Sequence, residues 1–120
     1  MTRQQQWAQA ALQDVLAAAE KGEDPAKKYR TACLKAASLV QRVGALQALA
    51  FWMSRSDAEF RAFATDVARA YRGSTAAGLR DELAVAPLPV YLSMTRDLGE
   101  VCLWYRRMAQ AELKGDDSNA

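Results

Sequence analysis

The sequence predicts an all-α protein, a compact bundle of about five to seven helices that ends in a long C-terminal helix. Alanine and leucine dominate the composition and β-branched residues are scarce, which favours helix over strand. The three prolines, Pro25, Pro87 and Pro89, stand where segments would begin rather than inside them. Between these boundaries, apolar residues recur at alternating steps of three and four, the period of an amphipathic helix.

The first two helices are predicted over about residues 3–21 and from Asp24 to Val43. Asp24 should cap the second helix, because its carboxylate accepts from free backbone N–H groups, and Pro25 should open it. Gly44 should end this helix or turn it sharply. The residues expected to face the core are Ala8, Leu12, Val15 and Ala19 in the first helix, and Tyr29, Cys33, Ala36, Val40 and Val43 in the second.

A third helix is predicted over residues 45–54, and a fourth begins at Ser56. The third is the most apolar segment of the chain and should be central. Ser56-Asp57-Ala58-Glu59 is typical of a capping box, in which the serine and the glutamate satisfy each other's backbone donors. The expected core residues are Leu46, Leu49, Ala50 and Met53, with Phe51 and Trp52 widening the stripe, and then Phe60, Phe63, Val67 and Tyr71.

The last third of the chain should contain a loop at residues 73–78, a short helix around 79–84, and the long C-terminal helix. That helix follows Pro87-Leu88-Pro89 and places one apolar stripe toward the core: Tyr91, Met94, Leu98, Val101, Tyr105 and Met108. The 120 residues should form a single domain. Residues 1–2 and the polar, acidic residues 115–120 should be frayed.

The residue types exclude several classes of function. Histidine is absent, which removes the commonest general base and most zinc sites. Cys33 and Cys102 lie far apart in apolar helical patterns, so they indicate neither a disulfide nor a metal site. No stretch has the length of a membrane span, and the N-terminus does not have the pattern of a signal peptide. We therefore expect a soluble, cytoplasmic protein with no cofactor, no metal ion and no membrane partner.

Two segments carry weak signals of catalytic chemistry. Gly73 and Gly78 have the spacing of a phosphate loop, but Leu79-Arg80 stands where such a loop needs Lys and Ser or Thr. Asp97 and Glu100 share one helical face and could hold Mg²⁺, although a solvated face paired with nearby arginines is favoured.

Trp7, Trp52 and Trp104 could stack on bases, but large aromatics at helical spacing are more often core residues.

Charge is distributed unevenly along the second predicted helix. The 16 basic and 14 acidic residues leave a net charge of +2, too small to indicate a nucleic-acid binder by itself. No acidic residue, however, lies between Pro25 and Val43. Basic side chains recur there every seven residues and form one stripe that could follow a phosphate backbone, although an ordinary soluble surface would explain them as well. The candidate phosphate contacts are Lys28, Lys35 and Arg42, followed by Lys27, Arg30, Arg106 and Arg107.

Three sequence blocks, taken in order, resemble a known family. They are Lys28-Tyr29-Arg30, the run GALQALAF from Gly44 to Phe51, and YLSMTRDL from Tyr91 to Leu98 followed by WYRRMAQA from Trp104. Over roughly Trp7 to Leu113 the chain resembles the small, all-helical subunit of the type III-B (Cmr) CRISPR effector complex. Val43-Gly44-Ala45 stands where that family usually has Asn-Gly-Leu, so the turn lacks an asparagine that tolerates a left-handed backbone.

The resemblance implies a non-catalytic building block of an antiviral ribonucleoprotein. Several copies would stack in an inner filament beside the large backbone subunits that hold the guide RNA. The implied partners are those subunits, further copies of the chain, and the duplex of target and guide RNA. The basic residues would then contact RNA phosphates without regard to sequence, because the guide supplies specificity by base pairing.

Three alternatives remain open. The chain could be the equivalent small subunit of a type III-A complex, which is similar in size and role. It could be a protein–protein adaptor whose basic stripe docks on an acidic partner. The third alternative is a magnesium-dependent nuclease that uses Asp97 and Glu100.

Overall fold

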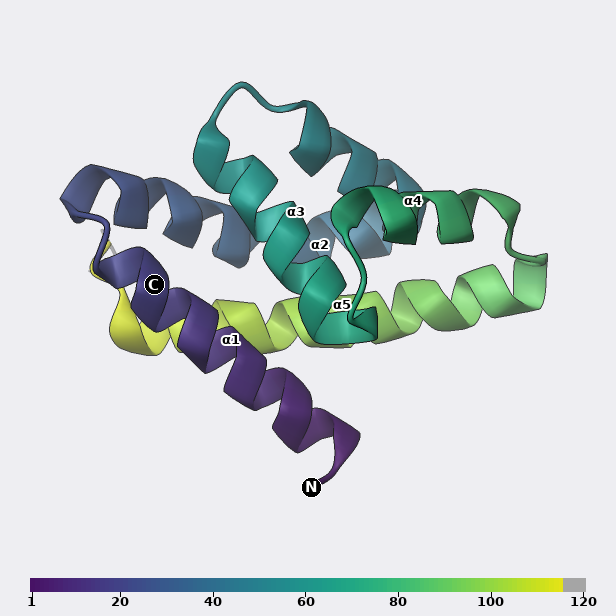
Figure 1. The fold of residues 1–120 in the computed structure, drawn as a ribbon, viewed down its shortest axis with the longest axis horizontal. Coiled ribbons are helices and arrows are strands. Elements are labelled where there is room, and N and C mark those ends of the chain that lie inside the picture. The colour runs from purple at the N-terminus through teal and green to yellow at the C-terminus, as the bar shows by residue number, and fades with distance from the viewer. Residues whose placement is uncertain (116–120) are drawn as a thin grey trace.

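The computed structural model of the chain describes residues 1–115, and these residues form a bundle of five helices without a strand (Figure 1). The helices are α1 (Arg3–Ala19), α2 (Glu23–Ser54), α3 (Ala58–Arg72), α4 (Ala76–Val85) and α5 (Leu88–Glu112). The all-α prediction and the long C-terminal helix are confirmed. None of the helices in this part of the chain is long and apolar enough to cross a membrane.

The core centres on Phe63 of α3, which is fully buried. Three aromatic rings contact it edge-on, at centroid distances of 5.9 Å for Tyr29, 5.1 Å for Trp52 and 5.5 Å for Tyr105. These rings come from the beginning of α2, the end of α2 and the C-terminal half of α5. Edge-to-face pairs of this kind stabilise a core beyond the area they bury, so Phe63 joins three segments that are distant in sequence.

Gly44 interrupts α2 and divides it into a first arm, residues 23–43, and a second arm, residues 45–54. Its φ of 84° and ψ of 165° lie in a region that only glycine adopts readily. The break frees two backbone N–H groups, and α5 supplies their acceptors. Ala45 N–H donates to Thr95 Oγ1 and Leu46 N–H donates to the Tyr91 hydroxyl, both at 3.2 Å.

The predicted sharp turn at Gly44 is therefore confirmed, and it does not need the asparagine that the family usually has before the glycine. Among the described residues, positive φ angles occur only at glycines. Val43 consequently keeps an ordinary backbone conformation, and the entire reversal takes place at Gly44.

A partly buried polar network ties four helices together. The Tyr105 hydroxyl of α5 donates to Asp14 of α1 at 2.5 Å, and the Tyr29 hydroxyl of α2 donates to Asp66 of α3 at 2.7 Å. The Arg69 guanidinium bridges the two carboxylates, at 2.5 Å from Asp14 and 3.3 Å from Asp66. Each partly buried carboxylate thus has both a hydroxyl and a guanidinium donor, which offsets the cost of removing it from water.

α1 and the second arm of α2 pack against the core through faces that differ from the predicted ones. The buried residues of α1 are Trp7, Ala11, Val15 and Ala18. In the second arm they are Ala45, Ala48, Leu49 and Trp52, whereas Ala50 is exposed. Both segments are alanine-rich and carry two overlapping apolar stripes, so the largest side chain decides between them. Trp7 packs edge-on against Tyr71 at 6.1 Å, and Trp52 packs against Phe63.

The predicted core faces of the other long segments are confirmed in the main. Their fully inward positions are Tyr29, Cys33, Ala36 and Val40 in the first arm, Phe60, Phe63 and Val67 in α3, and Met94, Leu98, Val101 and Tyr105 in α5. In these segments one apolar stripe is clearly stronger than any other, and local periodicity therefore identified it correctly.

Helix starts differ from the predictions at several positions. Gly22 is the N-cap of α2 in place of Asp24. Asp57 precedes α3 without a side-chain cap, and the predicted capping box at Ser56 does not form. The 55–57 turn is instead closed by the Arg61 guanidinium, which donates to the carbonyls of Arg55 at 2.6 Å and Ser56 at 2.8 Å. A side chain one helical turn into α3 thus replaces the local cap.

The structure also bears on the predicted frayed ends of the chain and on the predicted loop at residues 73–78. Thr2 forms a capping box with Gln5, which gives residue 2, predicted to be frayed, two local hydrogen bonds. Thr75 caps α4, which therefore begins three residues earlier than the predicted short helix and takes up part of the predicted loop. The fraying predicted for residues 115–120 falls almost entirely outside the described residues.

Alanine at three glycine positions should have three different effects. Gly99 is helical, with Val40 Cγ1 3.9 Å from an added Cβ, so Gly99→Ala should stabilise by about 0.5–1 kcal/mol. Gly73 has φ 66° and open space around it, so Gly73→Ala should cost about 1 kcal/mol. Gly44→Ala should cost about 3 kcal/mol, because its Cβ would also lie 2.5 Å from the Tyr91 hydroxyl. Urea unfolding measures these differences, and equal costs at positions 44 and 73 would contradict the role of Tyr91.

The stability of the polar network should depend on pH through Asp66. Burial raises the pKa of Asp66, although its hydrogen bond from Tyr29 opposes the shift. The folded state then holds the proton more tightly than the unfolded state. Its stability therefore falls as pH rises from about 3.9, the pKa of an unfolded aspartate, to the raised value, and is constant above it. Asp66→Asn cannot titrate at this position. As pH rises through this window, the stability of the variant relative to the wild type should therefore increase, which denaturant unfolding measures. A pH-independent difference would contradict the shift.

Candidate nucleic-acid interface

The first arm of α2 turns an apolar face to the core and a basic face to solvent. Lys28, Lys35 and Arg42 are all exposed. They share one face because seven residues make nearly two helical turns, about 3.6 residues each. Lys27 is exposed beside them. We call these four side chains the basic stripe.

Most of the charge in the basic stripe is not neutralised by other side chains among residues 1–115. Within residues 1–115, Lys27, Lys35 and Arg42 take part in none of the ion pairs. Among the described residues, Lys28 is the one member of the stripe near a carboxylate, with Nζ 3.9 Å from Asp57, and the two side chains are 56% and 32% exposed. Such a pair contributes little in water. The stripe therefore retains a positive potential that can attract an anion.

Arg30 does not belong to this face, contrary to its prediction from sequence as a phosphate contact. It is only 6% exposed. The residue lies four positions after Ala26 and three before Cys33, both buried, so helical periodicity places it on the inward side. An added Cβ at Gly115 would lie 2.5 Å from its Cζ, which shows how closely the end of the described chain covers the guanidinium.

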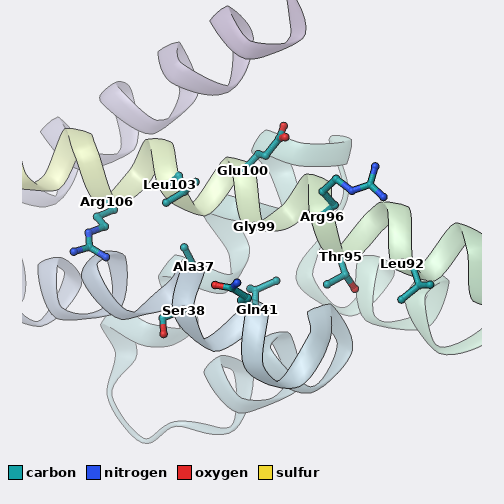
Figure 2. A pocket seen from close by; sticks show the side chains of 11 residues that line it. Ala37, Ser38, Gln41, Leu92, Thr95, Arg96, Gly99, Glu100, Leu103 and Arg106 are labelled. Carbon is teal, nitrogen blue, oxygen red and sulfur yellow. The ribbon is translucent and has the colours of Figure 1, made fainter.

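Arg106 and Arg107, predicted from sequence to act as one group, point to different sides of α5. Arg106 faces α2 beside Ala37 and Ser38 (Figure 2). Arg107 lies with Cζ 5.8 Å from the centroid of the Trp104 ring. Trp104 Nε1 in turn donates to Gln4 of α1 at 2.6 Å. Consecutive helical residues are about 100° apart, and only Arg106 is therefore on the same side of α5 as the first arm.

Arg106 lines a groove between the first arm and α5, of about 450 Å³ (Figure 2). The groove is mainly apolar, with Leu92 and Leu103 along its α5 wall. Arg96 lies further along α5 in the same groove, and sequence reasoning did not select it. Its spacing of ten residues from Arg106 was the available signal, but such a spacing is common on any charged helix.

A second groove, of about 240 Å³, lies where the two arms of α2 meet the start of α3. Lys28 and Lys35 line one wall, and Phe51 and Arg55 line the other. Sequence reasoning missed the last two residues as candidates because Phe51 was assigned to a widened core stripe. The structure brings them to the basic stripe only through the reversal at Gly44.

The carboxylates considered for a magnesium site serve another purpose. Asp97 pairs with Arg3 at 3.3 Å and accepts a hydrogen bond from the Tyr71 hydroxyl at 3.3 Å. Glu100 accepts from Gln4 Nε2 at 2.9 Å. These contacts hold the first turn of α1 against α5. No group of three or more potential metal ligands occurs among the described residues.

The remaining candidates for chemistry are core residues. Cys33 and Cys102 are fully buried, and burial raises the pKa of both thiols, which keeps them protonated and poor nucleophiles. Trp7 and Trp52 are buried as well, and Trp104 is partly buried. The core interpretation of the three tryptophans is therefore favoured over a stacking surface.

The sequence and the fold match known proteins. A family model described as CRISPR-associated protein (Cas_Cmr5) matches residues 3–112. The CRISPR system Cmr subunit Cmr5 of Thermus thermophilus is 38% identical over 110 residues, which cover 92% of this chain and 95% of the relative.

A crystal structure of a CRISPR-associated Cmr5 family protein, also from Thermus thermophilus, superimposes with a TM-score of 0.88 at 37% identity. The match covers 95% of this chain and 99% of that one. The resemblance recognised in the sequence blocks is thereby confirmed. The chain belongs to the Cas_Cmr5 family of CRISPR-associated proteins.

Proposed function

We propose that the chain is a non-catalytic structural subunit of a type III-B (Cmr) effector complex in the cytoplasm, where it contacts target RNA in antiviral defence. Membership of the Cas_Cmr5 family supports the assignment to the complex, since a relative of nearly equal length is a Cmr subunit. Its partners are then the large backbone subunits, other subunits of the complex and further copies of the chain, stacked in the inner filament.

The basic stripe is the observation that best supports the proposed RNA contact. Its exposed cations lie along one helix, and most of them are without an ion pair in the described part of the chain. Phosphate contacts made by such side chains depend on charge and not on base sequence. A subunit of a guided complex needs this kind of contact, because it must accept every target that the guide selects.

The state of the side chains that an enzyme would use for catalysis also supports a structural role. The sequence has no histidine, and both thiols are buried and protonated. Asp97 and Glu100 are engaged in docking α1. We therefore assign RNA cleavage in the assembled complex to subunits other than this one.

Reversing the charge of Lys28, Lys35 and Arg42 to glutamate should weaken target-RNA binding by the assembled complex about tenfold or more at physiological salt. The slope of log K against log salt should also become shallower, by about one for each phosphate that is no longer neutralised. Binding is measured by titrating labelled target RNA into complexes reconstituted with wild-type or variant subunit. Circular dichroism checks that the fold is unchanged.

The matched control reverses three other exposed cations, Lys21, Arg80 and Lys114, and alters the net charge by the same amount. Equal losses in both triple variants would indicate a general charge effect and contradict a specific stripe. Unchanged affinity in the first variant would refute the phosphate contacts. In that case, recovery of acidic proteins with the tagged chain after RNase treatment would favour the adaptor function.

A further inference from the structure

The groove between the two arms of α2 combines positive charge with an exposed aromatic ring. Lys28 and Lys35 stand on the first arm, and Arg55 follows the second arm on the opposite wall. Among the described residues, Asp57 is the one acidic residue in the lining, and both Lys28, at 3.9 Å, and Arg55, at 3.2 Å, pair with it. Three cations against one carboxylate leave this groove with an excess of positive charge.

Phe51 is exposed in a region where its aromatic neighbours are not. It is 43% exposed, whereas Trp52 and Phe60, which line the same groove, are buried. Leaving a phenylalanine in water forgoes a large part of the hydrophobic stabilisation that burial would provide. Phe51 and Trp52 are about 100° apart on the helix, so the burial of Trp52 leaves Phe51 at the margin of the buried face, beside the basic stripe.

The guanidinium of Arg55 fixes the position of this ring. Its Cζ lies 4.6 Å from the centroid of Phe60 and 5.4 Å from that of Phe51, within the range of cation–π attraction. The Arg55 carbonyl in turn accepts from Arg61, which closes the 55–57 turn. Phe51 is thus an exposed ring whose position is stabilised by a neighbouring arginine side chain.

We propose that Phe51 stacks on an unpaired RNA base while Lys28 and Lys35 contact the phosphates beside that base. The proposal rests on the RNA-contacting function given above and adds a site for the base itself. Proteins that bind single strands without sequence preference combine a basic groove with aromatic side chains, because every base has a π-face. Lys28 and Lys35 are two helical turns apart, about 10 Å, and can flank one stacked nucleotide.

An acidic protein segment fits the groove less well than RNA. Carboxylates would be attracted by the same cations, but they would leave the Phe51 ring without a flat partner. A nucleotide uses both features, since its phosphate meets the ammonium groups and its base covers the ring. The protein partner is therefore the competing outcome of the test.

The test compares Phe51→Ala, Phe51→Leu and Phe51→Trp in the full chain. Leu16→Ala, which truncates an exposed apolar side chain on α1, is the matched control. The probe is a labelled oligouridylate, and binding is followed by fluorescence anisotropy at several low salt concentrations, where phosphate contacts are strongest. The alanine and leucine variants should lose about fivefold or more in affinity at every salt concentration, with the salt slope unchanged. The tryptophan variant and the control should bind as the wild type does.

An oligomer with the same sugar-phosphate backbone but no bases isolates the stacking contact. The wild type should bind it about as weakly as Phe51→Ala binds oligouridylate, and Phe51→Ala should lose nothing further. If the variants lose affinity for both oligomers equally, or if none of them changes binding, the stacking site is refuted. Failure of the wild type to bind oligouridylate at low salt refutes it as well.

Different measurements would refute the phosphate contacts of the basic stripe and the stacking of a base on Phe51. Removal of the phosphate contacts appears as a changed salt slope in the charge-reversal variants, measured on the assembled complex. Removal of the stacking interaction appears as a base-dependent change at constant slope in the Phe51 variants. If Phe51→Ala and Phe51→Leu instead prevent the chain from entering the complex and leave oligouridylate binding intact, the ring is a protein contact and the stacking proposal is wrong.

Discussion

The reversal at Gly44 is the constraint on which both the core and the surface depend. Its backbone angles are open only to glycine, and its position against the Tyr91 hydroxyl leaves no room for a Cβ. The turn returns the second arm along the first, which carries Trp52 to Phe63 in the core. The same reversal brings Phe51 to the basic stripe. Thr95 and Tyr91 accept from the N–H groups that the break exposes, so α5 stabilises a turn that would otherwise bury unpaired donors.

The stability of the core and the proposed RNA contact depend on opposite faces of the same helix. The inward face of the first arm contributes Tyr29, whose ring packs on Phe63 and whose hydroxyl satisfies Asp66. Its outward face carries Lys35 and Arg42, which make no ion pair in the described part of the chain. Exposed cations contribute little to folding, so this face can be devoted to charge at small cost in stability. The arrangement agrees with the proposed role, in which the subunit keeps its shape while its basic face contacts RNA.

The phosphate and base contacts proposed for this surface differ in their physics and complement each other. Attraction between the stripe and a phosphate backbone is long-ranged and weakens with salt, because it depends on the release of counterions. Stacking on Phe51 is short-ranged and insensitive to salt. Neither contact reads base sequence, which agrees with a complex in which the guide supplies specificity.

The sequence by itself determined the helical class, the glycine turn and the acid-free helix, because these follow from residues within a few positions of one another. Periodicity within a short window also identified the inward faces of the first arm, α3 and α5. Only the tertiary structure decided which stripe of α1 is buried, since Ala-rich helices offer two and Trp7 selects one by meeting Tyr71. The inward position of Arg30 and the separation of Arg106 from Arg107 follow instead from helical periodicity, so a closer use of the same local pattern could have identified both. Contacts between segments far apart in the chain, such as Phe51 beside Lys35, depend on the direction of the chain after Gly44, which no local pattern contains.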